Sequence, residues 1–166
     1  MDIDQPMTKL RFLEQLLAER ERWDALLIEV GERRMTEAME PGGWSVKDVV
    51  AHIAWSEREM VGVMRERALV GSDLWNLEQD ERNRIVYEEN RDRPLDEVLA
   101  EARDVYRDFL ECVKHLADDD LHDPGRYLGM PPDWTPWRVL AGCCYHHYAD
   151  HHTEVRAWLD GQTGDE

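Results

Sequence analysis

Several features of membrane and disulfide-stabilised proteins are missing from this chain of 166 residues. It contains no run of about 20 apolar residues, so we expect no membrane span. The N-terminal residues Met1-Asp2-Ile3-Asp4 are acidic and lack the basic start and apolar middle of a signal peptide, which predicts a cytoplasmic protein. The three cysteines, Cys112, Cys143 and Cys144, are odd in number, and two are adjacent, so a disulfide framework is not expected.

Positive charge is also scarce. Lysine and arginine total 20 against 37 aspartates and glutamates, which gives a net charge of −17. Because proteins bind the nucleic-acid backbone mainly through lysine and arginine, we expect no nucleic-acid partner and interpret the acidic excess as a self-repelling surface. With 42% hydrophobic residues and no internal repeat, the sequence predicts one domain over residues 1–166.

Strand signals are lacking, and helical periodicity takes their place. It predicts an all-α fold with helices near 8–34, 45–70, 94–117 and 135–160, and a short extra helix within 76–90 in the crossover. The second helix begins at Ser45, which with Asp48 predicts a capping box. In the first helix, charges such as Arg20 fill the gaps in a stripe of apolar residues at three- and four-residue steps or their sums: Leu10, Leu13, Leu17, Trp23, Leu27 and Val30.

The last predicted helix carries two histidines on its apolar stripe, which consists of Leu140, Cys144, His147, His151, Val155 and Trp158. Buried polar groups need partners, and two histidines one turn apart can present two nitrogens to one metal ion. His146 and His152 fall off this stripe. Together with His115 and His122, they are predicted to be surface residues.

A third histidine, His52, lies on the second predicted helix, on the face of Val49 and Ser56. A lone histidine there is more often a core or boundary residue than a ligand. However, the helical rise places His52 about 10 Å from the start of its helix, and the midpoint of His147 and His151 about 15 Å from the end of theirs. The same midpoint lies about 20 Å from the start of the last helix, so the levels match better if the two helices are antiparallel. This arrangement predicts a four-helix bundle with up-down-down-up topology.

Three segments together resemble a known family: Gly43 to Trp55, with the sequence GWSVKDVVAHIAW, His147-Tyr148-Ala149-Asp150-His151, and Val155-Arg156-Ala157-Trp158-Leu159. They are similar to the DinB/YfiT-like superfamily, and most similar to its ClbS/DfsB-like branch. The resemblance covers about residues 8–160. It implies an up-down-down-up bundle, a homodimer, and a divalent metal held by His52, His147 and His151. It also implies two kinds of precedent: thiol-dependent transferases and isomerases, and a hydrolase that opens a strained ring in a genotoxin.

Three neutral imidazoles suit zinc or nickel, and iron is also compatible. Because three protein ligands leave positions open, such a site can hold water or a substrate thiolate. Together with this ligand chemistry, the resemblance implies a metal-dependent hydrolase or thiol-dependent transferase that acts on a small electrophilic molecule, in the second case with a low-molecular-weight thiol as cosubstrate. Metal affinity should fall below about pH 6, as the histidines become protonated.

Four further residues are candidates for the pocket, and each also has a simpler interpretation. Cys144 can approach the metal or be a small apolar core residue, and Glu59 can carry protons or be a solvated charge. Trp55 and Ser56 can line a substrate cavity or fill a helix interface. Three alternatives remain: a hydrogen-bonded histidine cluster without metal, a protein that protects by capturing a small molecule without turnover, and a structural, dimerising bundle.

Overall fold

The computed structural model describes residues 5–163, which form α-helices, short 3₁₀-helices and no β-sheet, so the all-α prediction is confirmed. Met1 to Asp4, on which the expected location depends, lie outside the described residues. None of the described helices has both the length and the apolar character that a membrane span needs. The α-helices are α1 (Lys9–Val30), α2 (Val46–Glu66), α3 (Gln79–Asn90), α4 (Leu95–Lys114), α5 (Pro136–Cys143) and α6 (Tyr145–Thr163).

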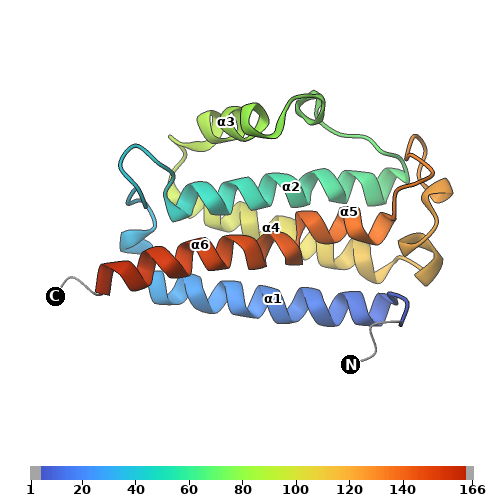
Figure 1. Ribbon diagram of the computed structural model, residues 1–166, viewed down its shortest axis with the longest axis horizontal. Coiled ribbons are helices and arrows are strands. Elements are labelled where there is room, and N and C mark those ends of the chain that lie inside the picture. Colours follow the sequence, from blue (N-terminus) through green and yellow to red (C-terminus); the bar gives the residue numbers. More distant parts are fainter. Residues whose placement is uncertain (1–4, 164–166) are drawn as a thin grey trace.

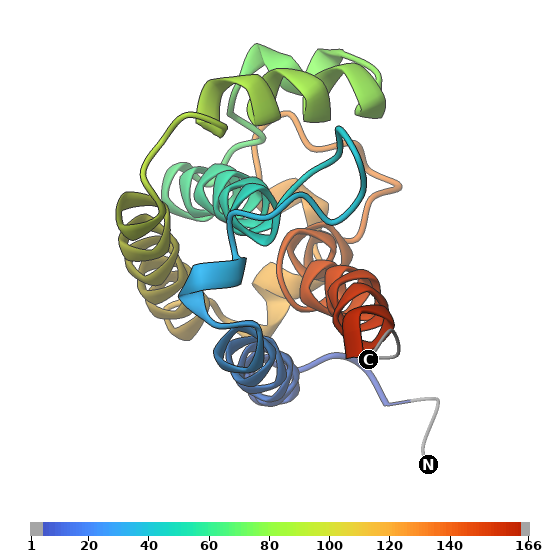
Figure 2. The same ribbon diagram turned by 90° about the vertical axis from the view of Figure 1, so that its left-hand side faces the viewer.

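Helices α1, α2 and α4 and the α5–α6 pair lie lengthwise around a common interior (Figures 1 and 2). In Figure 1, α1 and α6 run from right to left, whereas α2 and α4 run from left to right. Helix α3 lies outside this group, along the outer side of α2. The start of α2 therefore lies at the same end of the molecule as the end of α6, so His52 and the two α6 histidines can lie at a similar depth.

The inner face of α1 differs from the predicted stripe. Leu10 and Leu17, which belong to that stripe, are 68% and 49% exposed, whereas Arg20, which lies outside it, is only 9% exposed. Leucines occupy more than one side of this helix, so periodicity alone does not identify the packed side. The buried apolar side chains are Phe12, Leu16, Trp23, Leu26 and Val30.

The start of α2 is fixed by polar contacts, as the sequence predicts. The Asp48 N–H donates to Ser45 Oγ at 3.3 Å, and the Ser45 N–H donates to Asp48 Oδ2 at 2.8 Å, so the predicted capping box is confirmed. The buried Lys47 ammonium donates to the carbonyl oxygens of Arg91 at 2.6 Å and Arg93 at 2.8 Å. These bonds tie the chain between α3 and α4 to the first turn of α2 and hold α3 beside it.

The helix predicted over 135–160 is two helices, and the break falls at Cys144. This residue has φ −131° and ψ −96°, and its N–H donates to Ala141 O, only three residues back, at 3.2 Å. Cys144 and Leu140 are both buried, so the apolar pattern continues across the break. For that reason, periodicity did not reveal it. His147 and His151 both belong to α6, and their one-turn spacing is kept.

Candidate metal centre

Three histidines from two helices meet at one point, as the sequence analysis expects. His52 projects from α2 and is 8% exposed, while His147 and His151 project from α6 and are half-buried. The Nε2 atoms of His52 and His147 are 2.9 Å apart. One ring nitrogen from each of the three residues lies within 4.8 Å of the other two.

The distance between His52 and His147 fits two ligands of a divalent metal. Two nitrogens bound to one metal at 2.0–2.1 Å are about 2.9 Å apart for a right angle at the metal and about 3.4 Å for a tetrahedral angle. The observed 2.9 Å between His52 and His147 matches the first value. It also matches a hydrogen bond between two neutral imidazoles, in which one ring donates and the other accepts.

The second nitrogens of the three rings differ in their partners. His151 Nδ1 lies 3.0 Å from Glu154 Oε2, so this carboxylate orients the ring and leaves Nε2 free to face the other two. In contrast, Nδ1 of His52 and of His147 is buried and has no hydrogen-bond partner among the described residues. The 2.9 Å contact between their Nε2 atoms links the tautomers of these two rings, and the backbone of Cys143, four residues before His147, also interacts with the His147 ring.

Burial keeps two of the histidines unprotonated. It lowers the pKa of His52 to about 4, with further lowering by His151 and Arg82. It also lowers the pKa of His147 to about 2, with further lowering by His52 and His151, while the backbone of Cys143 acts weakly in the opposite direction. Both rings are neutral near pH 7, which is the form that binds a metal.

An aromatic pair and a cavity border the three histidines. The Trp44 ring centroid is 5.4 Å from that of His52, and the Trp44 ring stacks on Tyr87 of α3 with centroids 5.6 Å apart. Trp44 contacts His52, and Glu154 contacts His151. Both Trp44 and Glu154 also line a cavity of about 520 Å³. The histidines themselves do not line this cavity, and Trp44 and Glu154 are the residues that connect it to them.

Over residues 15–155 the chain matches the DinB superfamily. The chain belongs to the DinB superfamily. The solved structure of Sibling Lethal Factor Precursor – DfsB is similar over 95% of this chain and 98% of its own, with 16% identity and a TM-score of 0.77. The colibactin self-resistance protein ClbS was crystallised in complex with a dsDNA. Its structure is similar over 93% of this chain and 97% of its own, with 14% identity and a TM-score of 0.75.

A third structure, an uncharacterised protein from Escherichia coli UTI89, is similar over 98% of both chains, with 16% identity and a TM-score of 0.71. No curated protein matches the chain. Because the identities are this low, the similarity to these three structures shows a shared fold and no more.

ClbS contradicts one expectation from the sequence, namely that nucleic acid is excluded as a partner. ClbS has the same fold and is crystallised with dsDNA. The expectation was drawn from the net charge of the whole chain, but a protein contacts DNA through a local surface whose charge can differ from the total. For a DinB protein, acidic composition is therefore no ground for excluding nucleic acid.

Three predicted pocket residues on α2 make local contacts. Trp55 is half-buried and packs against Trp75, with ring centroids 5.0 Å apart. The Ser56 hydroxyl donates to the carbonyl oxygen of His52 at 3.3 Å, and the Glu59 carboxylate accepts the N–H of Ser72 at 3.2 Å. These bonds secure α2 and the chain after it.

The fourth candidate, Cys144, is fully buried in the hydrophobic core. Burial raises the pKa of its thiol well above the ordinary value, so the sulfur stays protonated. Its neighbour Cys143 lines a second cavity of about 500 Å³ together with Trp75 and Trp134. Of the two cysteines, the one at the cavity is thus Cys143, which the sequence analysis did not select.

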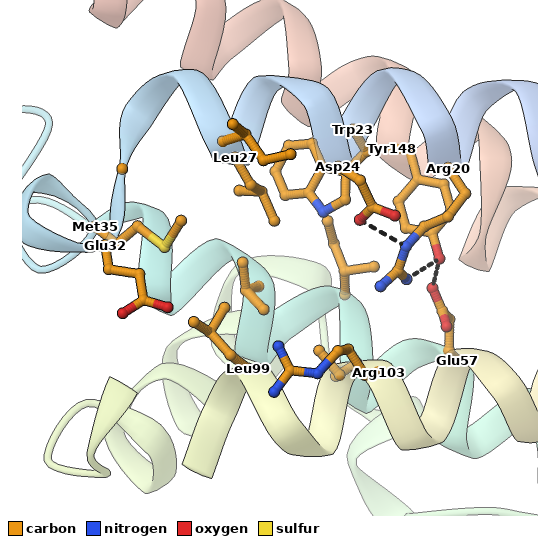
Figure 3. A pocket seen from close by; sticks show the side chains of 16 residues that line it. Arg20, Trp23, Asp24, Leu27, Glu32, Met35, Glu57, Leu99, Arg103 and Tyr148 are labelled. Atoms are coloured by element: carbon orange, nitrogen blue, oxygen red, sulfur yellow. Dashed lines mark hydrogen bonds and ion pairs between the residues drawn. The ribbon is translucent and has the colours of Figure 1, made fainter. Parts of the chain in front are cut away.

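A second polar group, absent from the sequence analysis, lies on another side of α2 and α6 (Figure 3). The Tyr148 hydroxyl donates to Glu57 Oε1 and accepts from Arg20 Nη1 at 3.0 Å, and Arg20 Nε donates to Asp24 Oδ1 at 3.0 Å. Glu57 is 1% exposed, and burial raises its pKa to about 7. Arg20 follows Phe12 and Leu16 at four-residue steps on the buried side of α1, which is the signal that could have revealed it.

Proposed function

We propose that this DinB protein is a metal-dependent enzyme that acts on a small electrophilic molecule, with His52, His147 and His151 as ligands. Zinc and nickel are the preferred metals for a site of three imidazoles, and iron is also compatible with it. The convergence of three ring nitrogens within 4.8 Å supports this proposal. When bound, a metal with open positions supplies Lewis-acid chemistry, by activating water for hydrolysis or by binding a thiolate for transfer.

The surrounding residues support such a site. Glu154 contacts Nδ1 of His151, which leaves Nε2 of that ring available as a ligand. Trp44 packs against His52 and is itself stacked on Tyr87 of α3. The cavity beside Trp44 and Glu154 is about 520 Å³, which is within the range of small-molecule sites. We propose that the substrate binds there, with a low-molecular-weight thiol as cosubstrate if the reaction is a transfer.

Metal analysis of protein purified without an affinity tag tests the proposal. His147→Ala should remove most of the metal while the far-ultraviolet circular dichroism stays helical. His146→Ala is the matched control, because His146 is exposed and outside the cluster, and it should keep full occupancy. If His147→Ala retains the metal, the proposal is wrong, and capture or a structural role takes its place. Metal-loaded protein is then screened for hydrolysis and for thiol transfer.

Double-stranded DNA is the second candidate ligand, because ClbS is crystallised with it. Fluorescence anisotropy with a labelled duplex at low salt measures binding directly. If the protein binds DNA through phosphate contacts, its affinity for the duplex should fall steeply as the salt concentration rises. An anisotropy that does not change with protein concentration would eliminate this candidate.

We also propose a single domain, an up-down-down-up bundle and a homodimer. Leu10, Leu17 and Ile28 are 68%, 49% and 81% exposed. At 100° per residue they fall within about 20° of one line along α1, so they form an apolar face that a second copy can cover. Light scattering should give the dimer mass, and Ile28→Glu should give the monomer mass. A monomer mass for the unmodified chain at high concentration would rule out the dimer.

A further inference from the structure

A cavity of about 400 Å³ lies between α1, α2 and α4, apart from the three histidines. None of the histidines lines it. His52 and Glu57 are five residues apart on α2, which places their side chains about 140° apart around the helix. The walls are mainly apolar and include Trp23, Leu27, Met35, Ile53, Leu99 and Ala102. This space is therefore distinct from the proposed metal site.

One end of this cavity is polar, and its hydrogen bonding is incomplete. Glu57 lines the cavity and is 1% exposed. Its Oε1 accepts from Tyr148, but its Oε2 is buried without a hydrogen-bond partner among the described residues. An unpaired polar oxygen inside a protein is unfavourable. When Glu57 is ionised, the cavity therefore presents a buried acceptor that lacks a donor.

The Tyr148 hydroxyl cannot supply that donor, because its single proton already goes to Oε1. Arg20 does not supply it either: its guanidinium donates to Tyr148 and to Asp24 (Figure 3), and none of its other N–H groups forms a hydrogen bond with Oε2. A molecule in the cavity can supply a donor for Oε2, and the apolar walls favour a molecule that also carries hydrocarbon.

Charge decides which donor fits. The lining residues include three carboxyl groups, Asp24, Glu32 and Glu57, but only two guanidinium groups, those of Arg20 and Arg103. Arg20 is paired with Asp24, and Arg103 is exposed at the rim. Glu57 interacts electrostatically with Arg20 but forms no ion pair with the described residues, so a cationic donor is favoured over a neutral one and an anion is disfavoured.

We propose that this cavity is a second ligand site, which binds a small apolar primary amine. Its ammonium group donates to Glu57 Oε2, and its hydrocarbon part packs against the walls formed by α1, α2 and α4. Binding completes the hydrogen bonding of Glu57 and replaces water on apolar side chains, so both parts of the molecule contribute.

Isothermal titration calorimetry with three probes of equal chain length, hexylamine, 1-hexanol and hexanoate, at about pH 8 tests this site, because the amine is then cationic. Hexylamine should bind with a Kd of about 1 mM or tighter. Hexanol should bind at least about tenfold more weakly because it lacks the charge, and hexanoate should not bind. Equal affinity for amine and alcohol, or no heat with the amine, would overturn the proposal.

Two variants locate the binding. Glu57→Gln keeps the shape of the side chain but removes its charge, so amine affinity should fall at least about tenfold while hexanol affinity changes little. Ala102→Leu places a larger side chain in the cavity wall and leaves Glu57, Tyr148 and Arg20 unchanged. Because it fills part of the cavity, it should prevent the binding of both hexylamine and hexanol. Circular dichroism and thermal unfolding verify that each variant is folded. Unchanged amine affinity in either folded variant would refute the assignment.

A chelator separates this site from the proposed metal centre. Amine affinity should be the same with and without the chelator, because the histidines do not line the cavity. Loss of amine binding on metal removal would refute a separate site, whereas amine binding that persists in protein without any metal supports it even if the metalloenzyme proposal fails.

Discussion

Replacing Glu57 with glutamine should make the protein more stable at neutral and alkaline pH, although the side chain is buried and hydrogen-bonded. In the folded protein, burial raises the pKa of this carboxyl group from its ordinary 4.5 to about 7, against the opposing effects of Tyr148 and Arg20. The folded state therefore holds a proton that the unfolded chain has already released between these pH values. By linkage, stability is lost as pH rises from 4.5 to 7.

The size of the effect follows from the two pKa values. Their difference of about 2.5 corresponds to about 3 kcal/mol at 1.36 kcal/mol for each unit of pKa. The penalty of the ionised Glu57 is about 1 kcal/mol at pH 5 and reaches about 3 kcal/mol at pH 8. Glutamine mimics the protonated acid at every pH, so Glu57→Gln should exceed the unmodified protein in stability by an amount that grows over this interval.

Urea unfolding followed by circular dichroism, in the presence of a chelator, measures this difference at a series of pH values. The lowered pKa values of His52 and His147 also make stability depend on pH, because stability is lost as pH falls through 6.5 toward those values. That contribution is common to both proteins and cancels in the difference. A difference between the proteins that stays constant from about pH 5 to about pH 8 would refute the reasoning.

Three other predictions concern α2 and the histidines. Ser45→Ala removes the cap of α2 and should lower the free energy of unfolding by about 1 kcal/mol in urea titration, and an unchanged midpoint would contradict it. Lys47→Met should increase hydrogen exchange in α3 but not in α1, because Lys47 holds the chain after α3, and equal change in both helices would argue against that role. Zinc release on acidification should have its midpoint below about pH 6, since the pKa values of His52 and His147 are about 4 and about 2, and a midpoint at the ordinary histidine pKa would show that burial does not protect them.

The sequence predicts the helical fold and the meeting of His52 with His147 and His151, because both depend largely on local spacing. The apolar period gives the helices, and Ser45 with Asp48 fixes where α2 begins. The starting point of α2 then sets the depth of His52. Metal binding at this cluster stays a prediction, since two neutral imidazoles at hydrogen-bond distance give the same spacing of nitrogens.

The buried face of α1, the group of Arg20, Tyr148 and Glu57, and the break at Cys144 could not be predicted from the sequence. They depend on which side of each helix is packed. Leu10 and Leu17 suggested one face of α1, whereas Arg20 lies on the face that is buried. Arg20 also needs Tyr148 and Glu57, which lie far away in sequence, and no spacing rule connects residues on three different helices. The backbone break at Cys144 is hidden for a similar reason, because buried apolar residues lie on both sides of it.

His147 and Tyr148 are consecutive residues of α6 that serve different sites, one among the histidines and the other against Glu57. Side chains at the surface of a helix lie about 5–6 Å from its axis, so turning α6 by about 10° would move both rings about 1 Å in the same rotational sense. A shift of that size changes whether a ligand distance or a hydrogen bond is satisfied. Any rotation of α6 about its axis therefore changes the geometry of both sites at once.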